Sequence, residues 1–270
     1  MKHLLTIAGS DSSGGAGIQA DLKTFAAHGV FGMSVITAVT AQNTCGVTLV
    51  QDMTPDMITA QIDAVFSDIR VDGVKVGMVS RSESICAIAE GLKKWKPPVV
   101  VIDPVMISKS GYPLLQPAAC DTLIRELLPL ATLLTPNLPE AEAICGFSIK
   151  KEGDMEKAAT AILSMGAKAV LVKGGHLEGR KADDFLSDGK EGIWLSGERI
   201  KTEHTHGTGC TLSSAIASNL AKGYALTESV QRAKDYISGA LAAMLDLGQG
   251  SGPMNHMFDL QGKYAKGVSR

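Results

Sequence analysis

A glycine-rich segment in the last third of the chain has the composition of an anion site. It reads Thr205-His-Gly-Thr-Gly-Cys210 and runs directly into a helical pattern over 208–222. Glycines and a threonine at a helix start can direct several backbone N–H groups at one point, where the helix dipole adds positive potential. Cys210 would lie in the first turn, where the pKa of a thiol is commonly lowered. An ordinary capped helix uses the same geometry, so this segment alone leaves both interpretations open.

Three further polar groups each follow a short apolar run that is typical of a strand buried in a parallel sheet. They are Asp103-Pro104, the pair Asn137 and Glu140, and Lys173-Gly174-Gly175-His176. The carboxylates and the amide supply oxygen ligands for magnesium, and the lysine supplies a cation for phosphate. Each group alone is an ordinary cap or a solvated charge. Together with Thr205–Cys210 they favour magnesium-dependent phosphoryl transfer, which depends on charge clamps and positioning.

A second glycine-rich segment, Gly9–Gly17, follows the first apolar run of the chain. Its Gly15-x-Gly17-x-x-Ala20 matches part of a dinucleotide-binding pattern, which needs an acidic residue about 20 positions later. The next expected strand ends in Thr40–Asn43, with no acidic residue before Asp52. Gly15-Ala16 stand where a phosphate loop requires lysine and Ser/Thr. Both of these nucleotide-binding loops are therefore disfavoured.

Short apolar runs alternate with amphipathic segments, a rhythm typical of βαβ units. Expected strands are Leu4–Ala8, Val35–Ala41, Gly73–Val76, Val99–Asp103, Leu133–Thr135 and Ala169–Lys173, and expected helices are 17–28, 55–67, 82–94, 117–128, 138–145, 154–165, 208–222 and 227–245. A β-hairpin is expected over Asp183–Ser187 and Gly192–Leu195. The pattern predicts an α/β fold with a doubly wound, mostly parallel sheet, whose ligands bind beyond the carboxyl ends of the strands. No linker divides it, so we expect one domain over residues 1–270.

The composition excludes several classes of protein. The chain has 270 residues, a formal net charge of −2 and 4% aromatic residues, so we expect no nucleic-acid partner. No run approaches the roughly 18 apolar residues of a membrane span, so we expect no membrane partner. The five cysteines are widely spaced, which favours a reducing, cytoplasmic location over disulfides or a zinc site.

The motifs, taken in order, resemble those of the hydroxymethylpyrimidine/phosphomethylpyrimidine kinases of thiamine biosynthesis, in the ribokinase-like superfamily. The segments that carry this resemblance are Ala8–Asp11, Ser13–Thr24, Thr40–Thr44, Asp103–Met106, Thr135–Glu140, Lys173–His176, Thr205–Cys210 and Gly250–His256. The resemblance implies a central sheet with helices on both faces and a small β lid or hairpin. It also implies that ATP, with Mg²⁺, phosphorylates 4-amino-5-hydroxymethyl-2-methylpyrimidine and then its monophosphate.

The resemblance further assigns roles to single residues. Gln42 would read the polar edge of the pyrimidine, since an amide donates and accepts hydrogen bonds at once. The rest of the substrate pocket would be formed by Gly9, Ala16, Asp21, Met78 and Val105. Metal and nucleotide would be bound by Asp103 and Glu140 (magnesium, in part through water) and by Asn137, Lys173, Gly174, Gly175 and Thr205 (ATP with its metal). Gly207, Thr208 and Gly209 would form the anion hole.

Cys210 stands where sugar kinases of this superfamily carry an aspartate that takes the proton of the substrate hydroxyl. Our hypothesis is that Cys210 is this base and not a covalent phosphoryl carrier. A pyridoxal or pyridoxine kinase, or an enzyme acting on both substrates, is the alternative, because relatives with this cysteine act on vitamin B6 compounds. A non-catalytic nucleotide-binding regulator is the alternative from another class. Relatives commonly form dimers, so a homodimer is expected.

Overall fold

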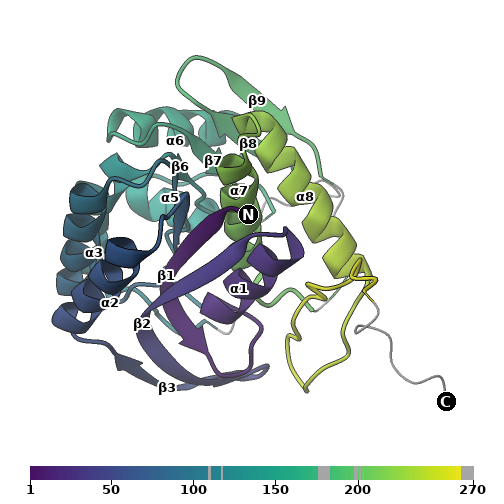
Figure 1. The fold of residues 1–270 in the computed structure, drawn as a ribbon. Helices are drawn as coiled ribbons and strands as arrows, with labels where there is room; N and C mark the ends of the chain where they lie inside the picture. The colour runs from purple at the N-terminus through teal and green to yellow at the C-terminus, as the bar shows by residue number, and fades with distance from the viewer. Residues whose placement is uncertain are drawn as a thin grey trace.

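In the computed structural model, the described residues contain nine strands, which form one sheet in the order β3-β2-β1-β4-β5-β6-β7-β8-β9 (Figure 1). The structure describes residues 1–108, 111–116, 118–175, 183–197, 200, 202 and 204–262. The strands are β1 (His3–Asp11), β2 (Phe31–Asn43), β3 (Gly46–Asp52), β4 (Gly73–Val76), β5 (Val100–Ile102), β6 (Leu133–Leu134), β7 (Val170–Val172), β8 (Asp184–Ser187) and β9 (Gly192–Leu195). The six strands from β2 to β7 in sheet order are parallel, while β3 and the β8–β9 hairpin add antiparallel edges.

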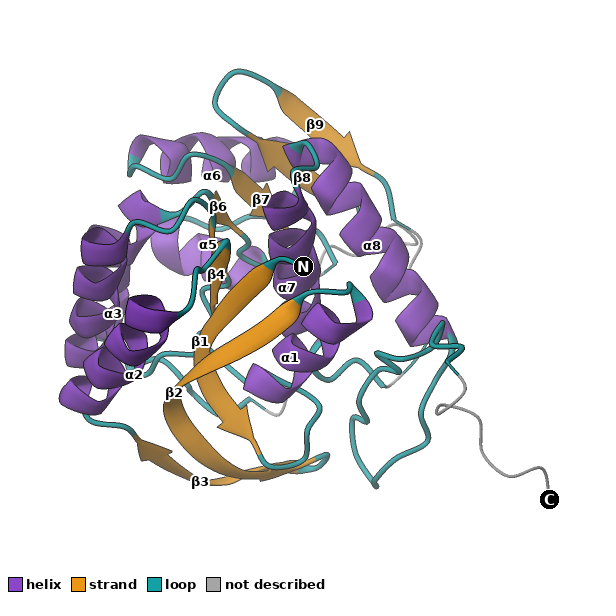
Figure 2. Cartoon of the chain, viewed as in Figure 1, coloured by secondary structure: helices purple, strands orange, loops and turns teal. Residues whose placement is uncertain are grey.

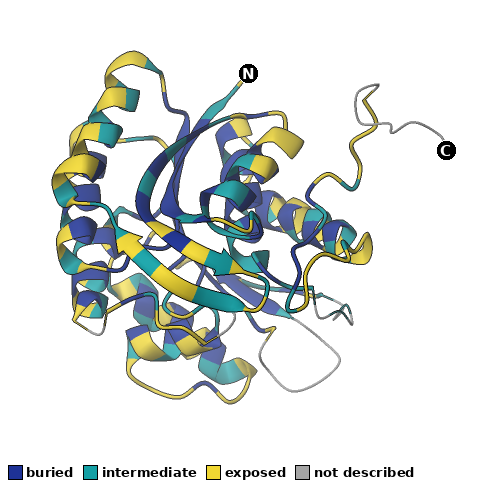
Figure 3. Ribbon diagram, turned by 90° about the horizontal axis from the view of Figure 1, so that it is seen from below, coloured by how far each residue is buried: buried dark blue, intermediate teal, exposed yellow. Residues whose placement is uncertain are grey.

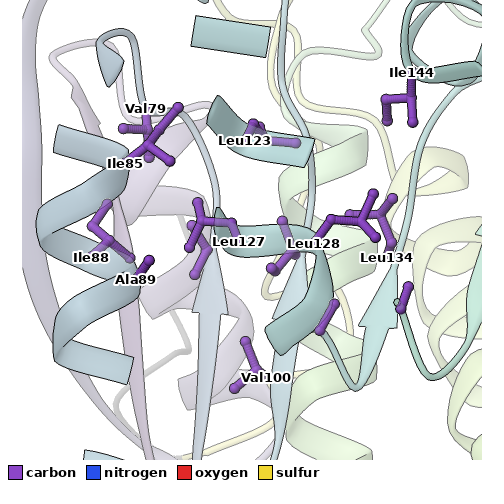
Figure 4. Close-up of a cluster of buried hydrophobic side chains, with 14 of the residues drawn as sticks. Val79, Ile85, Ile88, Ala89, Val100, Leu123, Leu127, Leu128, Leu134 and Ile144 are labelled. Atoms are coloured by element: carbon purple, nitrogen blue, oxygen red, sulfur yellow. The ribbon is translucent and has the colours of Figure 1, made fainter. Parts of the chain in front are cut away.

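Helices cover both faces of this sheet (Figure 2), as strands that are apolar on both sides require. The helices are α1 (Gly17–Ala27), α2 (Pro55–Asp68), α3 (Ser82–Trp95), α4 (Ala119–Thr122), α5 (Leu138–Cys145), α6 (Glu152–Ser164), α7 (Thr208–Lys222) and α8 (Leu226–Ala242). One core is formed between the sheet and α2, α3, α5 and α6, and Figure 4 shows part of it around Ile88 and Leu127. A second core is formed with α1, α7 and α8. The burial pattern in Figure 3 follows this layering, with exposed residues on the outer faces of the helices.

Local sequence explains where the site-bearing helices begin. Asn137 caps α5 and accepts a hydrogen bond from the Glu140 N–H, while the Glu140 side chain accepts one from the Asn137 N–H. This reciprocal capping box holds Glu140 at the end of β6. Gly207 precedes α7 with φ at +80°, a left-handed conformation that favours glycine. The helix can therefore begin directly at Thr208.

The structure confirms the predicted α/β class, with its mostly parallel sheet and helices on both faces. Strand β3 was not predicted; it pairs antiparallel with Ala38–Asn43 of β2, on the side of β2 opposite β1. The predicted helix 117–128 is α4 followed by a π turn, Leu123–Leu127, and a 3-10 turn, Leu128–Leu130; Pro117 lies outside the described residues. The predicted hairpin extends the sheet edge next to β7. Among the described helices, none is long and apolar enough to cross a membrane.

Candidate active site

A cleft of about 970 Å³ lies beyond the carboxyl ends of the parallel strands. Most of the residues predicted for the site line it: Gly9, Ala16, Gln42, Met78, Asp103, Val105, Asn137, Glu140, Lys173, Gly175, Thr205, Gly207, Thr208, Gly209 and Cys210. They come from the ends of six strands and from the first turn of α7. The sheet topology therefore brings together groups that are up to 201 positions apart, the separation of Gly9 and Cys210.

Two predicted residues lie outside the cleft wall. Asp21 is fully buried and pairs with Lys75, whose Nζ lies 2.9 Å from each carboxylate oxygen. The expectation that Asp21 forms part of the substrate pocket is therefore corrected, because its carboxylate is already occupied behind the site. Gly174 donates its N–H to Asp184 Oδ1 at 2.8 Å, and a Cβ there would lie 1.9 Å from the Asp183 carbonyl oxygen. Its backbone supports the hairpin, while Gly175 lines the cleft.

The N-terminus of α7 offers the backbone geometry of an anion site, one of the two interpretations that the glycines left open. Thr208 donates its N–H to the Thr205 carbonyl at 3.3 Å, and Thr211 donates to the Gly207 carbonyl at 2.9 Å. Within the described part of the chain, no acceptor is bonded to the N–H groups of Gly209 and Cys210. These two N–H groups, together with the helix dipole, can bind a phosphoryl oxygen.

Cys210 is partly buried in the cleft wall, and burial raises the pKa of its thiol to about 11. The Lys75 ammonium and a hydrogen bond from the Gly17 N–H act in the opposite direction but do not prevail over burial. The prediction of a lowered thiol pKa was wrong. Loss of hydration, together with the nearby Asp21 and Asp103 charges, disfavours the thiolate more than Lys75 and the Gly17 N–H favour it. In the ligand-free protein Cys210 is therefore a thiol at neutral pH.

A lysine and two acidic side chains lie close to the N-terminus of this helix, since a Cβ on Gly209 would come within 3.6 Å of Lys173 Nζ. Lys173 Nζ lies 2.9 Å from Asp103 Oδ1, which also accepts a hydrogen bond from Thr135 Oγ1 at 3.3 Å. Burial raises the pKa of Glu140 to about 7; Lys173 lowers this value and Asp103 raises it. Burial alone would lower the pKa of Lys173, but the negative charges of Asp103 and Glu140 outweigh it and hold this pKa above its ordinary value. The cluster keeps a lysine cation beside two carboxylates, which is a suitable setting for a metal–phosphate complex.

The donor set fits magnesium that arrives with a nucleotide. No group of three His, Cys, Asp or Glu side chains in the described ranges could hold a metal on its own. Magnesium commonly binds through one or two carboxylates, with phosphate oxygens and water completing its shell. A Cβ on Gly209 would lie 3.1 Å from Asp103 Oδ2, so this carboxylate oxygen faces the anion site. Asp103 is thus the residue best placed to contact such an ion, with Glu140 beside it.

The loop Gly9–Gly17 folds around its own carboxylate and not around a ligand. Asp11 accepts hydrogen bonds from the N–H groups of Ser13, Gly15 and Ala16 at 2.8, 3.1 and 2.8 Å. Burial tends to raise the pKa of Asp11, but hydrogen bonds from His206, Ser13 and Ala16 outweigh it and lower the pKa to about 2. The carboxylate occupies the N–H groups that a phosphate loop would offer to its ligand, which agrees with the rejection of that motif.

Sequence reasoning assigned no role to two groups at this site. Lys75 lies in β4, a strand with every residue buried, and a charge within an apolar run was the available signal. His206 lines the cleft and contacts Asp11 at 2.9 Å, a pairing across 195 positions that no local pattern reports. His176 lies outside the described residues.

Comparisons with known proteins agree with this geometry. A model of the family described as phosphomethylpyrimidine kinase matches residues 11–255. The hydroxymethylpyrimidine/phosphomethylpyrimidine kinase of Rhizobium meliloti is 56% identical over 255 residues, 93% of this chain and 96% of that protein. The crystal structure of phosphomethylpyrimidine kinase from Clostridium difficile 630 has a TM-score of 0.79 at 54% identity, covering 88% of this chain and 98% of that one. An ADP complex of Bacillus subtilis pyridoxal kinase has a TM-score of 0.88 at 41% identity, covering 95% and 98%.

Proposed function

The chain belongs to the phosphomethylpyrimidine kinase family, and from that premise we propose that it phosphorylates 4-amino-5-hydroxymethyl-2-methylpyrimidine and then the resulting monophosphate. The phosphoryl donor is ATP with Mg²⁺. One observation carries this proposal: the free N–H groups of Gly209 and Cys210 open into the same cleft as Gln42 and the Lys173–Asp103 pair. An acceptor, a donor nucleotide and the transferred group can therefore meet at one point.

The pyrimidine binds at the end of the cleft nearest β1, β2 and β4. Gly9, Met78 and Val105 give this end an apolar wall, and the Gln42 amide adds one donor and one acceptor. A flat, neutral heterocycle suits such a wall, because no charge has to lose its hydration. The hydroxymethyl group then points towards α7.

The nucleotide binds at the opposite end, between α7 and α8. Leu212, Ile237 and Leu241 supply apolar side chains there, and Thr205 and Gly175 lie closer to the anion site. Lys173 is placed to neutralise phosphate charge, and Asp103 with Glu140 would hold the magnesium. Bound magnesium would supply further positive charge for the phosphate oxygens.

The reaction needs alignment more than covalent chemistry, since phosphoryl transfer proceeds through a loose transition state. The substrate hydroxyl oxygen bonds to the γ-phosphorus as the bond to ADP breaks. The two free N–H groups of α7 bind the oxygens of the transferred group, where its charge is spread. Because Cys210 is protonated in the ligand-free protein, we propose that it orients the hydroxyl by a hydrogen bond instead of acting as a thiolate base. The hydroxyl proton leaves on a phosphoryl oxygen or to water.

Two substitutions at Cys210 test this assignment. Cys210→Ala removes the hydrogen bond, and we expect kcat to fall on the order of 100-fold. Cys210→Ser keeps a hydroxyl that can orient the substrate but cannot serve as a base near neutral pH, and it should retain most of the lost activity. ADP release with the aminopyrimidine is the measurement. Near-normal turnover in Cys210→Ala would remove Cys210 from the mechanism, and a serine variant as poor as alanine would restore the base hypothesis.

A pyridoxal kinase activity is the second candidate, and the similarity to solved pyridoxal kinases favours including it. Pyridoxal is also a flat heterocycle with a hydroxymethyl group. ADP release should be measured with the aminopyrimidine, its monophosphate, pyridoxal and ribose side by side. Turnover of pyridoxal alone would assign the second function, and ATP binding without any turnover would favour the regulator.

We also propose a homodimer located in the cytoplasm. Val39, Ala41 and Leu49 are exposed on one face of the β2–β3 pair, where the register sets Ala41 opposite Leu49. An apolar face on an edge pair suits contact with a second copy. The five cysteines are free thiols, as a reducing compartment permits. Sedimentation of the wild type and of Leu49→Lys tests the dimer, which the lysine should weaken.

A further inference from the structure

His206 joins Asp11, in the glycine-rich loop, to Gln42, which contacts the pyrimidine in the proposed function. Its Nε2 lies 2.9 Å from Asp11 Oδ2 and 3.1 Å from Gln42 Nε2. The His206 side chain is 9% exposed and lies against Gly15, where a Cβ would come within 2.4 Å of His206 Cδ2. Its backbone N–H donates to the Gly252 carbonyl at 3.2 Å. Ring and backbone are thus both held, and the ring cannot turn away from Asp11 without displacing the glycine loop.

The contact with Asp11 decides where the imidazole carries its proton. Asp11 is surrounded by N–H donors and is ionised, so its oxygens only accept hydrogen bonds. A bare Nε2 lone pair at 2.9 Å from this oxygen would be repulsive. His206 must therefore carry a proton on Nε2, either as the neutral Nε2–H tautomer or as the imidazolium.

That proton in turn decides the orientation of the Gln42 amide. A protonated Nε2 has no lone pair to accept a hydrogen bond from an amide NH₂ group, so the group facing it must be the Gln42 carbonyl oxygen. The two ends of an amide have the same outline and are assigned from the hydrogen-bond network. A half-turn of the amide places Oε1 at His206 and Nε2 at Thr40, without moving another atom.

Thr40 is compatible with the same half-turn. Its Oγ1 lies 3.0 Å from the Ser10 carbonyl oxygen and 3.1 Å from the other end of the Gln42 amide. The hydroxyl has one proton, which the Ser10 carbonyl can only accept. Thr40 Oγ1 therefore donates to Ser10 and accepts from the Gln42 NH₂ group. Each end of the Gln42 amide is then specified by a different neighbour.

We propose that Asp11, His206 and Thr40 are positioning residues that hold the Gln42 amide in this single orientation and so select the heterocycle by the hydrogen-bond pattern of its edge. This inference rests on the proposed function, in which Gln42 contacts the pyrimidine. The remaining lone pair of Oε1 accepts from an exocyclic amino group, and the remaining N–H donates to the adjacent ring nitrogen. A 4-oxo pyrimidine presents a carbonyl and a ring N–H, which is the reversed pattern. It would fit only after the amide turned and set N–H against N–H at His206.

Selectivity for the amino edge over the oxo edge is the kinetic test. A site built to hydrogen-bond one edge rejects an analogue that leaves its polar groups unpaired by large factors. We expect kcat/KM for the 4-amino substrate to exceed that for the 4-oxo analogue by at least about 1000-fold in the wild type. His206→Phe and Thr40→Val each release one end of the amide and should reduce this ratio by at least about 10-fold, with part of the change being a gain for the oxo analogue. A merely structural defect would lower kcat/KM for both substrates by the same factor and leave their ratio unchanged.

Thr48→Val is the matched control. Thr48 Oγ1 donates to the Ala41 carbonyl at 3.0 Å, one residue from Gln42, without touching its side chain. This variant should keep the wild-type ratio. An unchanged ratio in both His206→Phe and Thr40→Val would overturn the proposal, as would an equal change in Thr48→Val.

Nitrogen-15 NMR of the imidazole gives a second readout that needs no activity. The resonances of His206, assigned by their loss in His206→Phe, should show a proton on Nε2 in the ligand-free protein at pH 7.5. A bare Nε2 with the proton on Nδ1 would overturn the proposal. If the wild type does not phosphorylate the aminopyrimidine at all, the proposed function fails, and this spectrum still decides the amide orientation.

Discussion

The buried ion pair behind the anion site makes the strongest energetic prediction of this structure. Lys75 and Asp21 are both fully buried, and Asp21 also accepts hydrogen bonds from Thr6 Oγ1 at 2.6 Å and Ser214 Oγ at 2.7 Å. Ser214 lies one turn beyond Cys210 on α7. The pair therefore joins β1, β4, α1 and α7 at one point.

Lys75→Met removes the cation and leaves the Asp21 carboxylate in the core with two hydroxyl donors. Breaking one partner of a buried pair costs about 3–5 kcal/mol, because an uncompensated charge remains. For a chain of this size, that corresponds to a fall in Tm of about 6–20 °C. Urea unfolding followed by circular dichroism measures the free energy, and thermal unfolding measures Tm.

Two further variants separate the charge effect from the loss of packing. Lys75→Met combined with Asp21→Leu removes both charges, and it should recover most of the lost stability, since apolar replacement of a buried pair is often near neutral. Lys94→Met is the matched control, because Lys94 pairs with Asp63 on the surface. Its Tm should change far less. A Lys75→Met variant that loses under about 1 kcal/mol, or a double variant that loses the sum of both single effects, would refute the reasoning.

Three other outcomes follow from single groups. Burial, aided by the Lys23 charge, lowers the pKa of His256 to about 4, so the unfolded chain binds a proton first as pH falls. The free energy of unfolding should therefore drop by about 3 kcal/mol between roughly pH 6.5 and 4. In His256→Gln, urea unfolding should show a free energy that lacks this decrease with pH. Alkylation of Cys210 by iodoacetamide, followed by peptide mass spectrometry, should still accelerate above pH 10; a plateau near about 8.5, the value of a free thiol, would contradict the role of burial. Gly207→Ala would place a Cβ 1.9 Å from the Gly15 carbonyl oxygen and should lower kcat at least about 100-fold. Gly29→Ala, also at a left-handed glycine but with nothing within 4 Å, should retain activity.

The sequence predicted most elements because their patterns are local. Gly73–Val76 and Leu138–Cys145 were predicted with the observed bounds from the alternation of short apolar runs and amphipathic segments. Strand β3 was missed because Gly46–Asp52 mixes polar and apolar residues and has no buried residue, so no buried face marks it. It pairs with Ala38–Asn43 at the end of β2, along the edge that faces away from β1, and so lies at the border of the sheet.

The sequence by itself determined which groups follow each strand, and the parallel topology then required those groups to meet at one edge. Only the tertiary structure decided what those groups do to one another. Burial raises the thiol pKa of Cys210 although Lys75 lies nearby, and Asp21 pairs with Lys75 behind the cleft wall. The contact of His206 with Asp11 joins residues 195 positions apart. Local patterns record the type and spacing of residues. Desolvation and proton placement instead depend on which atoms, from distant parts of the chain, lie in direct contact with each ionisable group.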